Sequence, residues 1–490
     1  MGTIAQDTSN LNETAAPAYA WTTAPQKSSG RFDKVLNLVE ALWDGLASAG
    51  AVVAAIAVKE HFRIGVQVHY SPEIAILAGT LTGAFFVLLL DHQGAYHGGN
   101  SLLQIKETER VLRVATLATF LVVLLLYAAG FLVPRVLIAI SFVFVVVSLT
   151  TAKQLFYVTS HNLRARGLGV QEVVIYGAGQ SGRRVFSALA RSPKLGLVPI
   201  AIVDDDSNLE GQEIFEPGYR RDKSLRVSSG PITPDLLRCL NAKLLVIAIP
   251  SLAPDRLSAA MKTAHEAGVG VALMPQFNRE SRFSIEYMEV DGLMLFSYGI
   301  RKRRIASDLL KRVLDLTAAC LTLIALSPLF ALIALLVRLD SPGPILFVQK
   351  RAGKNGRLFP LYKFRSMHTH APSYACSPDR LDDPRITSVG RFLRRTSLDE
   401  LPQLFNVIKG EMSLVGPRPE MPFLVSYYTP AQRQRLSVLP GITGLWQLSA
   451  DRAYPIHDNL LYDLYYIRYR GFFLDVAVLL HTLVFAMKGI

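Results

Sequence analysis

Charge and cysteine are both scarce in this chain. Of its 490 residues, 19% are charged and 50% are hydrophobic, whereas about 25% of the residues in an average soluble domain are charged. The three cysteines, Cys239, Cys320 and Cys376, lie too far apart for a zinc-binding motif or a disulfide framework. The sequence therefore excludes a small disulfide-rich fold, and its cysteines are compatible with a reducing cytosol.

The first 30 residues lack an apolar core, so we expect no cleaved signal peptide there. They are rich in Ser, Thr, Ala and Pro, a composition that buries too little apolar surface to fold. We therefore predict a disordered tail over residues 1–30.

Long hydrophobic runs are abundant instead. Four runs, at residues 35–58, 73–90, 111–133 and 136–156, reach the length that crosses a bilayer as a helix, roughly 20 residues. Lys and Arg are more numerous before the first run, between the second and third, and after the fourth. By the positive-inside rule, both ends of this region are cytoplasmic. We predict four transmembrane helices within residues 31–157, with everything after residue 157 in the cytoplasm.

Two acidic residues, Glu40 and Asp44, lie four positions apart in the first run and share one helix face. Ionisable groups inside a membrane often line a polar pathway. Near a helix end they can instead be solvated or paired with a cation. The sequence leaves both interpretations open.

Residues 158–300 have the pattern of a Rossmann-like α/β domain. Short β-rich runs alternate with helical patterns, which predicts a parallel sheet flanked by helices. The first run leads into a Gly-x-Gly-x-x-Gly motif at Gly177, Gly179 and Gly182, and the acidic residues 204–206 stand where a ribose contact is expected. Glycines in this place also serve a tight turn and close packing, so nucleotide binding is left open.

A fifth hydrophobic run, residues 313–337, is interrupted by Ser327-Pro328. Proline removes a backbone donor and bends a helix, and basic residues flank both ends of the run. A helix that enters the membrane, bends and returns to the cytoplasmic side accounts for both features. A kinked through-span, the alternative, would export everything that follows. We predict a linker and a re-entrant membrane helix over residues 301–340.

Residues 341–490 are rich in positive charge, with 19 Lys and Arg against 11 Asp and Glu. Such a balance suits an anionic membrane surface, nucleic acid or a phosphorylated substrate, and no nucleic-acid-binding motif is present. Four basic or turn-forming stretches, QKRAGKNGR, YKFRSM, GRFLRR and SLVGPRP, could hold phosphate groups. Because this region follows a predicted membrane hairpin, we expect a phosphate-bearing substrate at the bilayer surface.

Two adjacent carboxylates, Asp399 and Glu400, interrupt this basic region in the stretch RRTSLDELPQL. Ser397-x-x-Glu400 and Thr396-x-x-Asp399 both fit a capping box ahead of an apolar helix, so the pair could be structural. A carboxylate near a helix N-terminus with arginines close by is held ionised. It can then bind Mg²⁺ or attack phosphorus to form an acyl phosphate. The structural and functional interpretations are compatible with each other.

Two stretches carry a family resemblance. DPRITSVGRFLRRTSLDELPQLFNVIKGEMSLVGPRPE, residues 383–420, and LPGITGLWQLS, residues 439–449, resemble the bacterial sugar transferase family, the monotopic-type phosphoglycosyl transferases. The resemblance extends from about residue 311 to the end of the chain. With the four apolar runs and the Rossmann-like region upstream, the chain is similar to the large members, the undecaprenyl-phosphate glucose or galactose phosphotransferases.

This resemblance implies a phosphotransferase at the cytoplasmic face of a bacterial inner membrane, with a UDP-hexose, undecaprenyl phosphate and Mg²⁺. Asp399 matches the residue that attacks the β-phosphate and expels UMP, after which undecaprenyl phosphate takes the hexose phosphate from the enzyme. Glu400 matches the second acid, with metal binding or proton handling implied. The candidate substrate-binding residues are Lys363, Arg365, Arg394, Arg418 and Asp475, with a supporting role expected for Asp475. The candidate metal ligands are Asp399, Glu400 and Glu420.

One stretch departs from the family pattern. Where the family commonly has Ser-Gly-Arg after the tryptophan motif, this chain has Ser449-Ala450-Asp451-Arg452. The glycine is absent and an acid precedes the arginine. No sugar- or nucleotide-binding role is therefore carried over to Arg452.

Two other classes of function were weighed. A membrane-anchored NAD-dependent sugar-nucleotide epimerase or dehydratase needs a catalytic Tyr and Lys on one helix face. Tyr219 and Lys223 lie instead in a Gly/Ser-rich stretch, where a four-residue spacing does not align them. A non-enzymatic membrane scaffold or nucleotide sensor would leave the motifs of residues 383–448 unexplained.

The expected fold is thus a membrane protein of α plus α/β class. It comprises four transmembrane helices, a Rossmann-like domain, a re-entrant helix hairpin and a mostly helical cytoplasmic catalytic domain over residues 341–490. The expected partners are a UDP-hexose, undecaprenyl phosphate and membrane lipid, without nucleic acid. A homo-oligomer is compatible with the sequence, which does not indicate the hexose transferred.

Overall fold

The computed structural model describes residues 31–487 except 67, 97–103, 132, 167, 191–195, 216–223, 275–282, 291–292, 301–304, 372–382 and 450–459. The predicted tail, the Tyr219–Lys223 pair and Arg452 lie outside the described residues. The chain divides into two compact units, one with residues 171–187 and 199–302, the other with residues 31–170, 188–198 and 303–490. The bounds of the five predicted regions stay a prediction.

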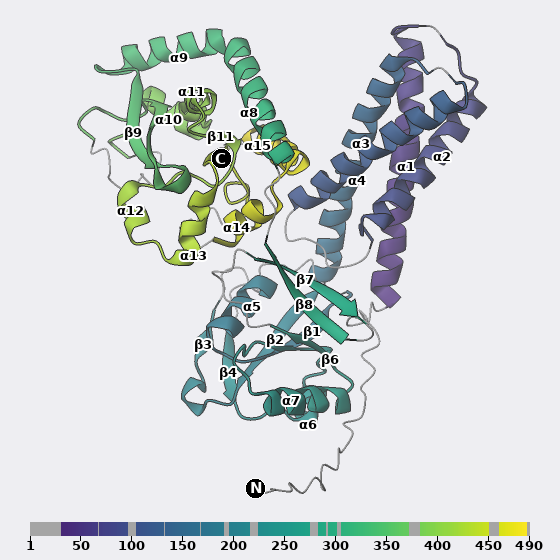
Figure 1. The fold of residues 1–490 in the computed structure, drawn as a ribbon, viewed down its shortest axis with the longest axis vertical. Helices are drawn as coiled ribbons and strands as arrows, with labels where there is room; N and C mark the ends of the chain where they lie inside the picture. Colours follow the sequence, from purple (N-terminus) through teal and green to yellow (C-terminus); the bar gives the residue numbers. More distant parts are fainter. Residues whose placement is uncertain are drawn as a thin grey trace, which may run out of the picture. The chain divides into compact units, whose positions relative to one another are not determined.

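The N-terminal part of the larger unit is a bundle of four long apolar helices (Figure 1). They are α1 (Arg31–His61), α2 (Pro72–His92), α3 (Gln104–Ala128) and α4 (Arg135–Ala165). Each is long and apolar enough to cross a membrane, which confirms the prediction of four such helices. α1 and α2 pack so closely that a Cβ at Gly83 would lie only 2.5 Å from the carbonyl oxygen of Gly45. Glycine at this position allows the close approach.

Lys153 of α4 decides how the two acids of α1 are accommodated. Its ammonium lies 2.5 Å from Glu40 and 2.6 Å from Asp44. Tyr96 donates a hydrogen bond of 2.9 Å to Asp44. The acids are thus paired inside the bundle, which agrees with the second of the two interpretations.

The smaller unit holds a six-stranded sheet in the order β3-β4-β2-β1-β5-β6. β5 pairs in parallel with β1 and β6, β2 pairs in parallel with β4, and β3 is antiparallel to β4. The strands are β1 (Gln171–Tyr176), β2 (Leu197–Asp204), β3 (Glu213–Ile214), β4 (Leu225–Ser229), β5 (Leu244–Ile247) and β6 (Gly270–Leu273).

Three helices connect these strands, α5 (Gln180–Ala190), α6 (Pro234–Cys239) and α7 (Pro254–Glu266). The alternation of strands and helices confirms the Rossmann-like prediction. β3 and β4 are additions that the hydrophobic pattern did not reveal. β7 (Phe283–Val290) and β8 (Leu293–Ile300) form a separate antiparallel hairpin.

The fifth hydrophobic run forms a bent helix pair. α8 (Ile305–Ala325) and α9 (Ser327–Asp340) meet at 64°, with Leu326 between them. Pro328 stands in the first turn of α9, where its missing N–H leaves no helical hydrogen bond unmade. The bend therefore falls where Ser327-Pro328 predicted it. Either a broken span or a re-entrant loop has this form, so re-entry stays a prediction.

The C-terminal part of the larger unit packs short helices against two small sheets. β9 (Leu346–Ala352) and β10 (Leu358–Phe364) form an antiparallel hairpin, and β11 (Ser413–Val415) runs parallel to β12 (Gly441–Thr443). The helices are α10 (Ser388–Arg395), α11 (Gln403–Lys409), α12 (Pro422–Ser426), α13 (Pro430–Arg433), α14 (Leu460–Tyr469) and α15 (Phe472–Met487).

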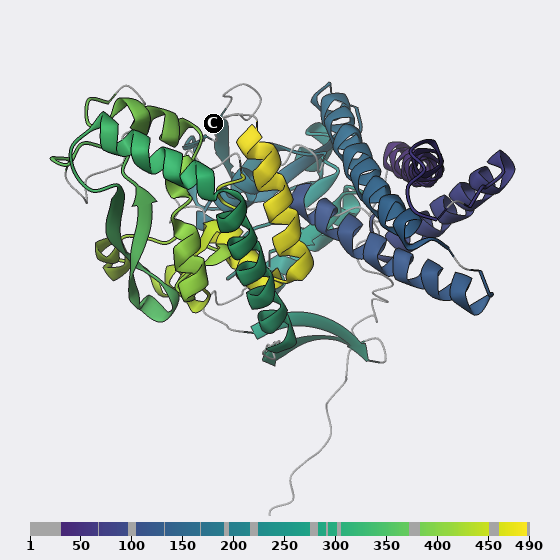
Figure 2. The same ribbon diagram turned by 90° about the horizontal axis from the view of Figure 1, so that it is seen from above.

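One buried core joins these elements. It includes Leu404 and Val407 of α11, Val415 of β11 and Val478 of α15. Helix α15 lies beside α8 in both views (Figures 1 and 2). The bent helix pair is thereby anchored to the domain that carries the acidic pair.

Candidate active site

The acidic pair is placed by a left-handed turn and not by a helix cap. Helix α10 ends at Arg395, and Ser397 then adopts φ 56° and ψ 17°, which residues other than glycine rarely do. A single 3₁₀ turn, Leu398–Glu400, follows. Ser397 makes no side-chain cap, and the Thr396 hydroxyl donates back to a carbonyl of α10 at 2.9 Å. The capping-box interpretation is therefore wrong.

Two cations hold Glu400. Lys363 of β10 places its Nζ 2.6 Å from a carboxylate oxygen of Glu400, and Arg418, after β11, places a guanidinium nitrogen 3.3 Å from the same oxygen. Burial by itself raises the pKa of Glu400, but Lys363 and Arg418 outweigh burial and lower this pKa to about 2. Glu400 is therefore an ionised carboxylate that is already paired.

At Asp399, burial outweighs the neighbouring cations, which is the opposite of the balance at Glu400. The Asp399 side chain is buried, with the residue 7% exposed. Burial raises the pKa of Asp399 and Glu400 raises it further, while Lys363 and nearby arginines lower it by less. We expected the arginines to hold this carboxylate ionised, but its net pKa shift is upward because burial prevails. Once ionised, such a carboxylate is a stronger base and hence a better nucleophile.

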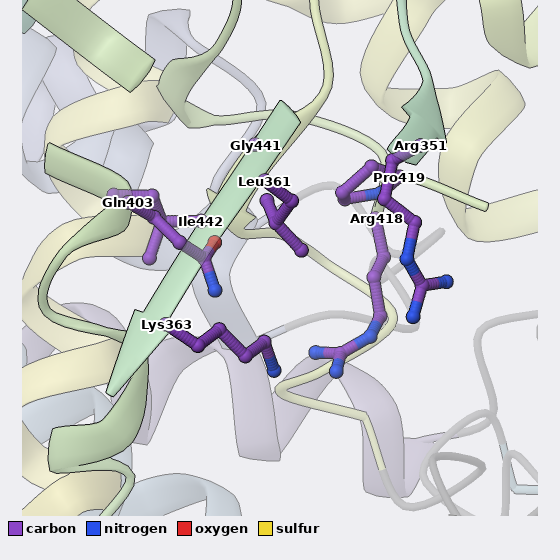
Figure 3. Close-up of a pocket in the computed structure, with 8 residues that line it drawn as sticks. All are labelled: Arg351, Leu361, Lys363, Gln403, Arg418, Pro419, Gly441 and Ile442. Carbon is purple, nitrogen blue, oxygen red and sulfur yellow. The ribbon is translucent and has the colours of Figure 1, made fainter. Parts of the chain in front are cut away.

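A pocket with three cations in its wall lies beside the pair (Figure 3). Figure 3 shows the head groups of Lys363 and Arg418 reaching toward the same space from β10 and from the segment after β11. Both side chains also contact Glu400. Such a wall is suited to phosphate oxygens. The lining residues are Arg351, Leu361, Lys363, Gln403, Arg418, Pro419, Gly441 and Ile442.

Two polar lining residues were not named individually from the sequence: Arg351, which lies within the expected phosphate-binding stretch QKRAGKNGR, and Gln403. Arg351 lies opposite Phe359 in the β9–β10 hairpin. Residues two apart in a strand share a face, so Arg351 lies on the same face of the hairpin as Leu361 and Lys363. This alternation across a tight turn is the signal that could have identified Arg351. Gln403 carries no comparable signal.

Asp475 supports the segment that leads to Arg418. It is fully buried and accepts hydrogen bonds of 2.8 Å from both Lys311 and Tyr466. The same two donors bond to the carbonyl oxygen of Val415, at 3.1 and 2.8 Å. Val415 is the last residue of β11, three positions before Arg418. The supporting role expected of Asp475 thus has a geometric basis, and it stays a prediction.

Arg365 lies at a different place, the C-terminal end of α9. Its guanidinium donates hydrogen bonds to the carbonyl oxygens of Val337, Ser341 and Pro342, at 3.2, 2.6 and 3.0 Å. A helix end leaves such carbonyl groups without helical partners. Arg365 is 5% exposed and stabilises this helix end. The phosphate-binding role expected of it has no support in this geometry.

Arg394 and Glu420 have different contacts. Arg394 lies in the last turn of α10, close enough to lower the pKa of Asp399. Glu420 instead accepts a hydrogen bond from the backbone N–H of Met421. Among the residues that the structure describes, no group of three His, Cys, Asp or Glu side chains could hold a metal ion. The expected ligand set Asp399, Glu400 and Glu420 is therefore not assembled.

The glycine motif of the smaller unit forms the expected tight turn. Gly177 has φ 112°, and a Cβ at Gly182 would lie 1.7 Å from the Gly177 carbonyl oxygen. A Cβ at Gly179 would meet nothing within 4 Å, so this side of the turn is open. Asp204 accepts a hydrogen bond of 2.6 Å from the Ala178 N–H within the turn. Nucleotide binding at these glycines stays a prediction.

Known proteins match both units. Residues 306–489 match the family described as bacterial sugar transferase, and residues 92–275 match a CoA-binding domain. An undecaprenyl-phosphate glucose phosphotransferase of Komagataeibacter xylinus is 44% identical over 203 residues, 38% of each chain. An undecaprenyl-phosphate galactose phosphotransferase of Salmonella typhimurium is 32% identical over 347 residues, 66% of this chain and 70% of that one.

A third relative matches over a longer span. It is a UDP-glucose:undecaprenyl-phosphate glucose-1-phosphate transferase of Xanthomonas campestris pv. campestris, 30% identical over 380 residues, 75% of this chain and 77% of that one. The match to the Komagataeibacter protein spans less than two thirds of its length, whereas the other two exceed that share. The family match includes the acidic pair and its cationic pocket, so the chain belongs to the bacterial sugar transferase family and is a membrane-bound sugar transferase.

Proposed function

We propose that the protein transfers a hexose 1-phosphate from a UDP-hexose to undecaprenyl phosphate and releases UMP. This would be the first membrane step of exopolysaccharide, capsule or O-antigen synthesis. The observation that carries the proposal is the buried Asp399, adjacent to a Glu400 that Lys363 and Arg418 hold beside a cationic pocket. The names of the three relatives support the donor and acceptor classes.

The pocket supplies the binding step. Arg351, Lys363 and Arg418 present three positive charges, which Glu400 and Glu420 offset in part. A UDP-sugar brings a negatively charged diphosphate, whose oxygens suit this cationic wall. Binding would place the β-phosphorus near Asp399, and the cations would stabilise the negative charge that moves onto the leaving phosphate.

The transfer itself would take two displacements at the same phosphorus. A carboxylate oxygen of Asp399 forms a bond to the β-phosphorus while the bond to the oxygen shared with the α-phosphate breaks, and UMP leaves with that electron pair. A phosphate oxygen of undecaprenyl phosphate then bonds to the phosphorus and releases the Asp399 carboxylate. The raised pKa of Asp399 suits a carboxylate that must attack phosphorus.

Magnesium fits the donors present, although the three-carboxylate set is not assembled. Mg²⁺ is commonly held by one or two carboxylates together with substrate phosphates. Asp399 and Glu400 are the adjacent oxygen donors that would hold it, next to a pocket for the diphosphate. When bound, the ion would neutralise part of the charge of the diphosphate.

The test is UMP release by purified protein in lipid nanodiscs. With undecaprenyl phosphate, Mg²⁺ and a panel of UDP-sugars, we expect release from one or few donors, which identifies the hexose. Asp399→Asn should abolish release. Asp308→Asn is the matched control, because Asp308 pairs with Arg470 on a half-exposed surface and should retain activity.

A second readout concerns the covalent step. Without acceptor, the wild-type protein should gain the mass of one hexose phosphate on the peptide that contains Asp399. Turnover by Asp399→Asn, or a label on another residue, would contradict the mechanism.

A further inference from the structure

The backbone that carries Arg418 is held by other elements at almost every residue. Gly416 N–H donates to Thr443 at 2.9 Å, Gly441 N–H donates to Pro417 at 2.9 Å, and Ala352 N–H donates to Glu420 at 3.0 Å. These three are backbone–backbone hydrogen bonds. The carbonyl oxygen of Arg418 itself is held differently, by the side chain of Arg435 at 3.2 Å.

The Arg435 guanidinium spans three partners. Its Nε donates to Asp463 at 2.6 Å, one terminal nitrogen donates to the Tyr428 hydroxyl at 2.6 Å, and the other donates to the Arg418 carbonyl. Arg435 is 3% exposed and Asp463 2% exposed. The planar fork of arginine can satisfy three fixed directions at once, which a lysine ammonium on a flexible stem does less well.

Stability alone does not account for this arrangement. A buried ion pair loses the hydration of both charges, and well-packed apolar residues often stabilise a fold as much or more. Burial raises the pKa of Asp463, which reflects this desolvation. The bond from Arg435 to the Arg418 carbonyl has a use that apolar side chains could not supply.

The surroundings of the segment show what this bond prevents. Arg418 and Pro419 line the cationic pocket on one side and a second small cavity on the other. Arg435 and Tyr428 line that second cavity. Without the bond to Arg435, residues 417–419 could relax toward the cavity and turn Arg418 away from Glu400.

We propose that Arg435, held by Asp463 and Tyr428, is a positioning residue that directs Arg418 toward the diphosphate of the substrate. The proposal rests on the proposed function for the identity of that substrate. Arg435 does not touch the substrate in this scheme and acts through the backbone of Arg418. A misplacement of about 1 Å at a binding group can cost about 100-fold in rate.

The main test is Arg435→Lys combined with Arg418→Lys. Lysine keeps the positive charge beside Asp463 but loses the three-way fork. We expect Arg435→Lys to lower kcat/KM for the UDP-sugar about 10- to 100-fold. In the Arg418→Lys background the same change should have almost no further effect, because it acts through Arg418. The control is Arg433→Lys. Arg433 is an exposed neighbour whose side chain donates to the Tyr428 backbone carbonyl, and this change should be neutral.

The outcomes separate the alternatives. Losses that multiply in the double variant, or wild-type kinetics for a folded Arg435→Lys protein, would overturn the proposal. If Arg435→Lys fails to fold, Tyr428→Phe decides instead, because it removes the hydroxyl that accepts from Arg435 and keeps the ring. The same hydroxyl also bonds to Glu420, so only the part of the loss that disappears in the Arg418→Lys background is assigned to Arg435. We expect about a 3- to 10-fold loss for Tyr428→Phe, again absent in the Arg418→Lys background.

Binding of UDP by titration calorimetry distinguishes this proposal from the proposed function. If no UDP-sugar gives UMP release, the proposed function fails. UDP should nevertheless bind about 10-fold more weakly to Arg435→Lys than to the wild-type protein if the positioning role is correct. Equal UDP affinities of Arg435→Lys and the wild-type protein would rule out the positioning role, whatever the transfer assay shows.

Discussion

At the residue scale, burial and charge act on two adjacent carboxyl groups in opposite directions. Glu400 accepts ion pairs from Lys363 and Arg418, and its pKa falls to about 2. Asp399 is buried, and its pKa rises. One carboxylate therefore helps to hold the site together, whereas the charge of the other opposes folding. Groups that carry chemistry are often of the second kind.

Asp399→Asn should make the protein more stable at neutral pH while it abolishes transfer. The folded pKa of Asp399 lies above its unfolded value, so ionisation destabilises the fold as pH rises through these two values. Asparagine removes that penalty and keeps the shape. Thermal unfolding at pH 7.5 should show a higher midpoint for the variant, and the gain should vanish at pH 3.5. A lower midpoint at pH 7.5 would contradict the upward shift.

Glu400→Gln should destabilise the protein. The Glu400 pKa falls from 4.5 to about 2 on folding, which corresponds to about 3 kcal/mol of stability. This contribution is complete above pH 4.5 and is lost as the pH falls toward 2. The deficit of the variant in denaturant unfolding should therefore be large at pH 7 and small at pH 3. Asp308→Asn, from a partly exposed pair, should lose less than about 1 kcal/mol.

The sequence was sufficient to identify the pair, because a resemblance can be read from residue order. The sequence could not supply the direction in which the pKa of Asp399 shifts. Burial of Asp399 depends on elements that are distant in the chain, such as β10 and the segment after β11. The sequence indicated the stretch QKRAGKNGR but not Arg351 within it, since the relation of Arg351 to Lys363 depends on the register of a hairpin.

At the element scale, the end of α9 is completed by the residue that follows β10. Arg365 satisfies three carbonyl oxygens there, and Lys363, two residues earlier and within β10, serves the pocket. One basic stretch, YKFRSM, thus serves two purposes. Sequence reasoning assigned phosphate binding to both residues, because both are cationic.

Arg365→Met should separate these purposes. We expect a loss of about 2 to 3 kcal/mol in unfolding free energy, because buried carbonyl groups lose their donors. The KM for the UDP-sugar should stay unchanged in the folded fraction. Lys363→Met should instead raise that KM several-fold. Denaturant unfolding and initial-rate kinetics on both variants check the contrast, and a raised KM for a folded Arg365→Met protein would restore the phosphate-binding role.

Most elements could be predicted from the hydrophobic pattern and from the prolines and glycines that end or bend them. The four apolar helices, the Rossmann alternation and the bend at Ser327-Pro328 depend on local composition and on the chemistry of proline. The backbone conformation just before the acidic pair could not be predicted. The motif fitted a capping box, but Ser397 takes a left-handed conformation that only the surrounding packing can enforce.

At the scale of the whole molecule, the topology depends on whether the bent helix pair crosses the membrane. α8 and α9 are bent by 64°, and positive charge flanks both ends of the pair. If α8 and α9 enter and leave the membrane on one side, the catalytic domain faces the cytoplasm, where UDP-sugars are made. If they span the membrane, the domain faces outward.

Cysteine labelling decides between these topologies. In a variant without native cysteines, Lys354→Cys at the tip of the β9–β10 hairpin should react only from the cytoplasmic side. His69→Cys, between α1 and α2, is the matched control, with a side chain that is 87% exposed. It should react only from the opposite side. Labelling of both positions from one side would contradict the re-entrant topology.

The sequence by itself determined the membrane helices, the Rossmann-like unit, the family and the identity of the acidic pair. These depend on local composition and residue order. Only the tertiary structure decided which cations serve Glu400, that Arg365 belongs to a helix end, that Asp399, Glu400 and Glu420 do not assemble as one metal site, and that Arg435 reaches Arg418. The physical reason is that electrostatic and hydrogen-bond partners are chosen by distance in space, and these partners come from segments that are far apart in the chain.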